Sequence, residues 1–133
     1  MDGRSHKVWP DYIDVSTTAV AASITGGEVR VKDIRQEDLV TIRFFFEQLG
    51  FNMQLEGTDL VVSAGQNLRL KDKEWGRIKG IYSQPWYSFP SDLMSIAIVL
   101  AMNVDGSTLF FEKLYRDRMS FSANFNGAGA NII

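Results

Sequence analysis

The chain has 133 residues, which suits a single domain that buries a core of its own. It contains no cysteine and one histidine, His6, which excludes disulfide bonds and thiolate chemistry and leaves little for a metal site. The formal net charge of -2 provides no general attraction to nucleic acid or to an anionic membrane.

Neither a membrane-spanning segment nor a signal peptide is predicted. The longest apolar run, residues 96–102, is far shorter than the ~20 residues that a bilayer requires. The residues before Val8 lack the apolar stretch of a signal peptide. With the absence of cysteine, this favours a reducing, cytoplasmic location.

The first half of the chain predicts an alternation of helices and strands. Residues 12–15 are expected to be extended, and the hydroxyl groups of residues 16–18 to cap a helix over 19–24. Residues 28–34 alternate with period two, which is typical of a half-buried strand. A helix over 36–49 follows, with Gly50 at its C-terminal cap. Its apolar stripe consists of Leu39, Ile42, Phe45, Phe46 and Leu49.

A hairpin around Gly57 is expected to join residues 51–56 to residues 60–63. After a loop over 65–77, residues 78–83 are predicted to be extended. The next helix, residues 93–102, is apolar on nearly every side, so we expect protein to enclose it.

The last part of the chain predicts a strand over 107–112 and a helix over 117–128 that ends at Gly129. Adding 79 to Gly27 and Gly50 gives Gly106 and Gly129, so the order of elements is repeated. The predicted fold is therefore α+β, with one full βαβαββ unit and an incomplete second unit.

The whole chain, residues 1–133, is expected to form one domain. The first unit would span about 8–64, the connecting loop 65–77, and the partial second unit about 78–133. Because the second unit stops four residues past Gly129, we expect the chain to be a piece of a larger protein.

Asp92 is the first candidate site residue, since it stands at a helix start after the turn at Pro90. It could simply cap the helix, because aspartate is favoured there. Alternatively, the turn directs the carboxylate into a cleft, where it could accept a proton from a sugar hydroxyl group.

Two further candidates follow the same logic. Arg116 and Arg118 could together hold a phosphate or carboxylate group, or they could be ordinary surface charges near a helix start. Trp86 and Tyr87 could stack on a ligand ring, or they could anchor their loop to the core.

Taken in order, the motifs resemble the enolpyruvyl transferase family, and within it the UDP-N-acetylglucosamine 1-carboxyvinyltransferases. They are the segments 10–17 (PDYIDVST), 21–29 (AASITGGEV) and 89–93 (FPSDL), followed by Arg118. The resemblance covers nearly the whole chain from about Val8.

This resemblance implies a two-lobed fold in which each lobe contains three βαβαββ units. It also implies transfer of the enolpyruvyl group of phosphoenolpyruvate to the 3-hydroxyl of UDP-N-acetylglucosamine, a step toward peptidoglycan, without a cofactor. Asp92 would engage the sugar 3-hydroxyl, Leu114 would contact the nucleotide sugar through its backbone, and Arg118 would line the anionic part of the cleft. Asp92 and Arg118 are thus the expected catalytic residues.

The sequence departs from the family pattern at several positions. The family's Arg in the first motif is Tyr12 here, its Glu is Asp14 and its Gly is Ser16, while Arg116 and Asp117 replace Glu-Asn. The family's phosphoenolpyruvate-binding Lys and Arg and its Cys-bearing lid belong to parts that this chain does not contain.

We therefore expect one wall of an active site, inactive alone, whose partners are a nucleotide sugar and the remaining lobe or repeats, with no nucleic acid and no membrane. The alternative is a non-catalytic binding or assembly module that retains the repeat fold. Such a module could self-associate through an open sheet edge.

Overall fold

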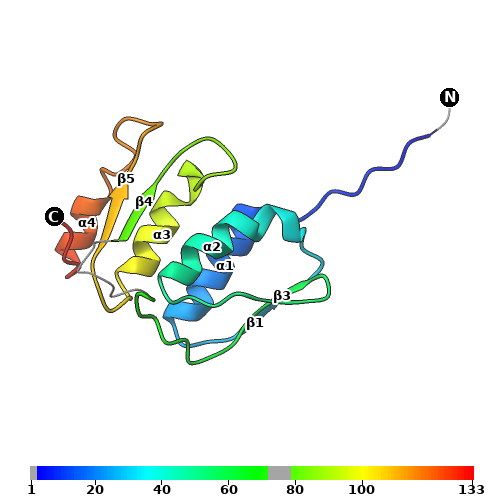
Figure 1. The fold of residues 1–133 in the computed structure, drawn as a ribbon, viewed down its shortest axis with the longest axis horizontal. Helices are drawn as coiled ribbons and strands as arrows, with labels where there is room; N and C mark the ends of the chain where they lie inside the picture. Colours follow the sequence, from blue (N-terminus) through cyan, green and yellow to red (C-terminus); the bar gives the residue numbers. More distant parts are fainter. Residues whose placement is uncertain (1–2, 72–78) are drawn as a thin grey trace.

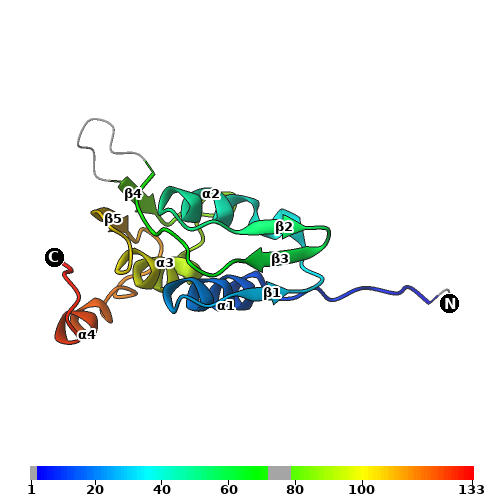
Figure 2. The ribbon, with the colours of Figure 1, turned by 90° about the horizontal axis from the view of Figure 1, so that it is seen from below.

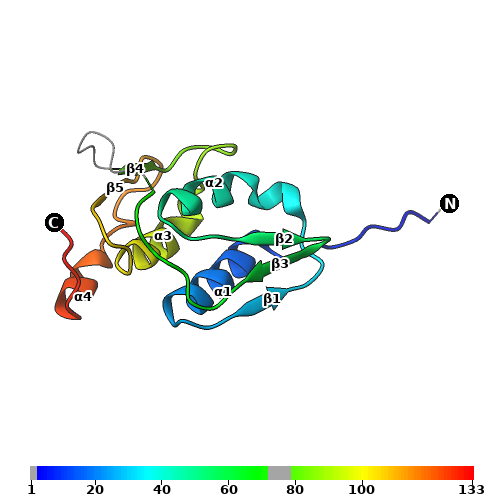
Figure 3. The ribbon, with the colours of Figure 1, turned by 60° about the horizontal axis from the view of Figure 1, so that its bottom comes forward.

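The computed structural model describes residues 3–71 and 79–133 and has the predicted α+β class (Figure 1). Its central helices are α1 (Tyr12–Ile24), α2 (Val40–Gln48) and α3 (Met94–Ala101). Helix α1 packs against α3, and α2 lies alongside them, with small sheets at two sides (Figures 1 and 3). Among the described residues, no helix is long and apolar enough to cross a membrane.

The first sheet contains the predicted hairpin, β2 (Gln54–Glu56) and β3 (Asp59–Val62), together with β1 (Val29–Val31). Its strand order is β1-β3-β2, and both pairings are antiparallel. This sheet lies over α1 and α2, so its inner side chains meet the helices (Figures 2 and 3).

The second sheet has two parallel strands, β4 (Lys79–Tyr82) and β5 (Thr108–Phe111). Ile81 pairs with Phe110 in this register. Parallel pairing places the ends of both strands at the same edge, and the site described below begins there. The loop expected over 65–77 is described only as far as Lys71, because residues 72–78, including the expected strand start at Ile78, lie outside the described ranges.

The core lies where the three helices and the two sheets meet. Phe46 of α2 is fully buried, with its ring centroid 5.8 Å from that of Phe51 and 6.1 Å from that of Phe89. Burying a side chain of this size contributes about 1.5–3 kcal/mol to folding. Phe89 therefore anchors the turn that precedes Asp92.

Helix α3 is enclosed by protein, as predicted from its apolar composition. No residue from Leu93 to Ala101 is exposed, and Leu93, Met94, Ala97 and Leu100 have no measurable exposure. The enclosed helix fixes the short 3-10 turn η3 (Ser91–Leu93) at its start. This turn carries Asp92.

The prediction of an extended segment over 12–15 is wrong, because α1 already begins at Tyr12. Asp11 caps the helix, and its carboxylate accepts a hydrogen bond from the backbone N–H of Ile13 at 2.8 Å. The hydroxyl groups at 16–18 therefore lie inside the helix. The first unit, among the described residues, has no leading strand and is not a full βαβαββ unit.

Two other helix boundaries differ from the prediction. Residues Gln36–Leu39 form a 3-10 turn, η1, whose N-cap residue, Arg35, makes no side-chain cap hydrogen bond, and α2 begins only after this turn. The last helix, α4 (Ser122–Gly127), starts later than 117. Asp117 has a positive φ of 61°, which interrupts a right-handed helix at that point.

The spacing of 79 residues persists in the structure. It relates β1 to β5, α1 to η3 with α3, and α2 to the segment that ends in α4. Gly50 and Gly129, which follow the second helix in each half, have positive φ values of 81° and 97°. The pairing of the strands differs, since β1 is antiparallel to β3 whereas β5 is parallel to β4.

Candidate functional site

Asp92 and Arg118 meet in the structure. Arg118 donates a hydrogen bond from Nη1 to Oδ1 of Asp92 at 2.7 Å, across 26 positions of sequence. The carboxylate side chain is 55% exposed and the arginine side chain 31% exposed, so the pair lies at the surface. Among the described residues, no hydrogen-bond donor reaches Oδ2 of Asp92, and this oxygen is open to a ligand.

Asp92 does not cap its helix, which removes the simpler of the two interpretations. The residue before η3 is Pro90, and neither η3 nor α3 has a side-chain cap hydrogen bond. The buried side chain of Leu93 instead fixes the backbone of the turn. The Asp92 carboxylate is thereby left to pair with Arg118.

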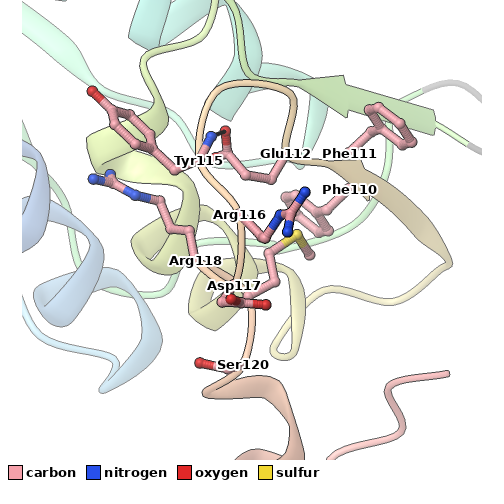
Figure 4. A pocket seen from close by; sticks show the side chains of 9 residues that line it. Phe110, Phe111, Glu112, Tyr115, Arg116, Asp117, Arg118 and Ser120 are labelled. Atoms are coloured by element: carbon pink, nitrogen blue, oxygen red, sulfur yellow. Dashed lines mark hydrogen bonds between the residues drawn. The ribbon is translucent and has the colours of Figure 1, made fainter.

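Arg118 lies in the loop that follows β5, and its guanidinium group stacks on Tyr115. The distance from Arg118 Cζ to the centroid of the Tyr115 ring is 4.4 Å (Figure 4). The hydrogen bond to Asp92 raises the pKa of Arg118 above its ordinary value, so the guanidinium group remains charged. The ring and the carboxylate together hold one face and one edge of the guanidinium group.

Arg116 does not join Arg118. The two guanidinium groups point to opposite sides of the loop (Figure 4), with Asp117 in a left-handed conformation between them. Only Arg118 reaches Asp92. The predicted clamp of two arginines on one anion therefore does not form in this conformation.

Glu112, at the end of β5, is a residue that the sequence did not single out. Its carboxylate accepts hydrogen bonds from the hydroxyl groups of Ser83 at 2.7 Å and Ser91 at 2.6 Å. It also accepts from the backbone N–H groups of Leu114 at 2.7 Å and Tyr115 at 3.2 Å. One carboxylate thus joins the end of β4, the turn of Asp92 and the loop of Arg118.

The surroundings of Glu112 keep it ionised. Burial raises its pKa, but the hydrogen bonds from Ser91, Ser83 and the amides of Leu114 and Tyr115 outweigh burial and lower the pKa from 4.5 to about 2. The sequence offers one weak sign of this role, a glutamate at the end of the predicted strand, and glutamates at such positions are common on protein surfaces.

Leu114 is 45% exposed and lies beside this network. Its backbone N–H group already donates a hydrogen bond to Glu112, so its carbonyl oxygen is the backbone group that remains for a ligand. A contact between Leu114 and a nucleotide sugar would therefore use a donor of the ligand, such as a hydroxyl or amide group.

Three aromatic side chains lie next to one another near the Asp92 carboxylate. Tyr12 packs on Trp86 with 5.6 Å between ring centroids, and Trp86 is 5.9 Å from Tyr87. Burial and then the charge of Asp92 raise the pKa of Tyr12, so its hydroxyl group stays neutral. Tyr87 is 83% exposed and Trp86 43% exposed, so Phe89, and neither of these two rings, anchors the loop to the core.

A shallow open depression of about 460 Å³ lies at the end of β5 and along the following loop (Figure 4). Its lining combines charged side chains, including Glu112, Arg116 and Arg118, with aromatic and other residues. The remaining lining residues are Phe110, Phe111, Tyr115, Asp117, Met119 and Ser120.

Residues 1–132 match the family EPSP synthase (3-phosphoshikimate 1-carboxyvinyltransferase). The chain belongs to this family. The resemblance to enolpyruvyl transferases inferred from the sequence motifs is thereby confirmed.

Individual members of the EPSP synthase family give a more specific picture. The chain is 38% identical over 129 residues to the UDP-N-acetylglucosamine 1-carboxyvinyltransferase of Bradyrhizobium diazoefficiens, covering 97% of the chain and 30% of that protein. It is 35% identical over 132 residues to the protein of the same name from Treponema denticola, covering 99% of the chain and 31% of that protein. The chain thus spans about a third of the length of these relatives.

Proposed function

We propose that this chain forms one wall of the acceptor-binding cleft of an enolpyruvyl transferase of the UDP-N-acetylglucosamine 1-carboxyvinyltransferase type. The observation that carries the proposal is the 2.7 Å pair between Asp92 and Arg118, which leaves Oδ2 of the carboxylate open to a ligand. Both residues come from motifs that led to the family. The relatives' names supply the reaction class.

Asp92 is proposed as the base that accepts the proton of the sugar 3-hydroxyl group. As this proton moves to Oδ2, the hydroxyl oxygen forms a bond to C2 of phosphoenolpyruvate, and C3 accepts a proton from a general acid that we place on another part of the enzyme. C3 then returns a proton to that group as the bond between C2 and the phosphate oxygen breaks. The products are the enolpyruvyl ether and inorganic phosphate.

Arg118 and Leu114 are proposed to position the substrates around this carboxylate. The guanidinium group of Arg118 orients Asp92 and provides fixed positive charge next to the anionic groups of both substrates. The carbonyl oxygen of Leu114 would accept a hydrogen bond from the nucleotide sugar. Asp92, Leu114 and Arg118 form one rim in this arrangement.

We propose that other parts of a longer parent protein complete the cleft. The spacing of 79 residues relates Ile42 and Phe46, which have no measurable exposure, to Phe121 and Phe125, which are half-buried. These two rings support the idea that other parts of the parent protein cover α4, as the β2–β3 hairpin covers α2. A repeat with units at about 8–64 and 78–133 belongs to this proposal, although the first unit lacks its leading strand among the described residues.

The 133-residue chain is expected to have no transferase activity alone, because the groups that hold phosphoenolpyruvate are proposed to lie on the missing walls. The test is phosphate release from phosphoenolpyruvate and UDP-N-acetylglucosamine, compared with a control without protein. Steady release above the control would refute the expectation of inactivity, and would place the whole active site within this chain.

Binding of the acceptor is the direct test of the site. UDP-N-acetylglucosamine is titrated into the ¹⁵N-labelled chain, and the amide signals of residues 91–93 and 112–118 are expected to shift together. Signals of the β1–β3–β2 sheet serve as the internal control. Shifts confined to that sheet, or none at millimolar ligand, would refute the proposed site.

The second candidate function is a non-catalytic binding or assembly module. Tyr12 favours it, because this ring packs on Trp86 at the position where the family has Arg. In that case the acceptor titration gives no shifts around Asp92, and the chain self-associates through a strand edge such as that of β2. Sedimentation of the chain over a range of concentrations distinguishes this outcome from a monomeric site.

A further inference from the structure

We propose that Glu112 is the positioning residue of this site, which joins the turn of Asp92 to the loop of Arg118 and so sets the geometry of the pair. This inference deepens the proposed function and names a residue whose role does not depend on direct contact with substrate. Its basis is the hydrogen-bond network of one carboxylate with three separate segments of the chain.

The two carboxylate oxygens of Glu112 have different partners. Oε1 accepts from the Ser83 hydroxyl group and from the N–H groups of Leu114 and Tyr115. Oε2 accepts from the hydroxyl group of Ser91, the residue before Asp92. One oxygen therefore shapes the loop after β5, and the other ties that loop to the Asp92 turn.

Ser83 strengthens the same connection from β4. Its side chain is fully buried, and its hydroxyl oxygen accepts a hydrogen bond from the backbone N–H of Lys113 at 2.8 Å while its proton goes to Glu112. The backbone N–H of Ser83 in turn donates to the carbonyl oxygen of Phe111 at 3.0 Å. The strand ends and the loop are thus fixed to each other on both sides of Glu112.

Three consequences for the rim follow from this network. The N–H groups of Leu114 and Tyr115 are turned inward, which directs the loop so that the Tyr115 ring lies against the Arg118 guanidinium group at 4.4 Å. Arg118 can then reach Asp92, whose own turn is held through Ser91. The negative charge of Glu112 also contributes to the raised pKa of Arg118.

The experiment compares Glu112→Ala with Glu112→Gln in the ligand-free chain by NMR. The glutamine keeps an acceptor oxygen for the three donors that Oε1 serves, and its NH₂ group can donate to Ser91 once the serine hydroxyl rotates. The alanine keeps none of these bonds. Positioning by hydrogen bonds therefore predicts that glutamine rescues the rim and alanine does not.

The readout is the stacking of Arg118 on Tyr115, which displaces the signals of the Arg118 δ-methylene protons upfield. We expect this displacement to be lost in Glu112→Ala and retained in Glu112→Gln. Glu56→Ala is the matched control, because Glu56 pairs with Arg30 on the far sheet. An unchanged Arg118 signal in a folded Glu112→Ala protein would overturn the proposal.

If Glu112→Ala does not fold, Ser91→Ala is used as the test instead. This variant removes only the hydrogen bond from Ser91 to Oε2 of Glu112 and leaves the hydrogen bonds to Oε1. The η-protons of Arg118 should then exchange faster with water than in the wild type, because the Asp92 turn is released. Equal exchange rates in the two proteins would overturn the proposal.

Acceptor binding separates this inference from the proposed function. Glu112→Ala should weaken the binding of UDP-N-acetylglucosamine about tenfold or more, with Glu112→Gln much closer to the wild type. If the wild-type chain binds no acceptor but the Arg118 signals respond as expected, the proposed function fails and the positioning role stands. If the acceptor binds to the wild-type chain but Glu112→Ala leaves the Arg118 signals unchanged, the proposed function stands and the positioning role fails.

Discussion

Arg118 and Asp92 are joined by a 2.7 Å hydrogen bond although each is placed by a different element. The buried Leu93 and the enclosed helix α3 fix the turn of Asp92, whereas strand β5 and Glu112 fix the loop of Arg118. An ion pair at the surface contributes too little free energy to hold two segments of the chain in place. The surrounding packing therefore determines the geometry of the pair.

Asp92→Asn should weaken binding of UDP-N-acetylglucosamine about tenfold, because a charged acceptor for the sugar hydroxyl group becomes neutral. The free energy of unfolding should change by less than about 1 kcal/mol, since the ion pair with Arg118 lies at the surface. Calorimetric titration and urea unfolding measure the two quantities.

Asp33→Asn is the matched control for this change. Asp33 is 57% exposed and accepts a 2.7 Å hydrogen bond from Lys7, so it resembles Asp92 in exposure and pairing. Its replacement should leave acceptor affinity unchanged. Equal affinities of the wild type and Asp92→Asn would argue against Asp92 as an acceptor ligand.

Phe46→Ala should destabilise the fold by about 3–5 kcal/mol, because it removes a fully buried ring that contacts Phe51 and Phe89. Phe44→Ala, in the same helix but 61% exposed, should change stability by at most about 0.5 kcal/mol. Urea unfolding distinguishes them, and similar losses for both variants would mean that α2 presents a different face to the core.

Gly50→Ala should destabilise the fold more than Gly57→Ala. Both glycines have positive φ, 81° and 61°, so an added Cβ costs about 1 kcal/mol at either position. At Gly50 the Cβ would also overlap the backbone carbonyl of Arg69, while at Gly57 it meets open space. We expect a loss of about 3 kcal/mol at Gly50 and about 1 kcal/mol at Gly57 in urea unfolding.

The sequence predicted the parts of the fold that depend on local pattern. The stripe of α2, the apolar α3 and the hairpin around Gly57 all follow from the spacing of side chains over a few residues. Segment 12–15 was misassigned because its aromatic and β-branched residues favour strands, whereas the cap at Asp11 starts a helix.

For the site too, the sequence predicts the residues that stand in recognisable motifs and misses the residue that acts through distant contacts. Asp92 and Arg118 were found through motifs that led to a family, and the structure brings them together. Glu112 was not found, because its partners Ser83 and Ser91 lie 29 and 21 positions away and serines give no distinctive pattern. Hydrogen bonds between distant segments become visible only after the strands pair and the helices pack.

The pH dependence of stability provides the last test. The folded-state pKa of Glu112, about 2, lies below its ordinary value of 4.5. Its ionised form therefore stabilises the fold fully above about pH 4.5, and this contribution is lost as the pH falls through 2. Glu112→Gln removes the titrating group but keeps the hydrogen-bond geometry, so the protein should lose less stability than the wild type on acidification.

Urea unfolding at a series of pH values from 6 to 3 measures the effect. The advantage of the wild type over Glu112→Gln should be about 1–2 kcal/mol at pH 6, should stay nearly level down to about pH 4.5, and should shrink from there toward pH 3. Ser107→Ala, an exposed serine just before β5, should follow the wild-type curve. Parallel curves for the wild type and Glu112→Gln would mean that Glu112 titrates alike in the folded and unfolded chain, and that its hydrogen bonds to Ser83, Ser91 and the loop do not persist in solution.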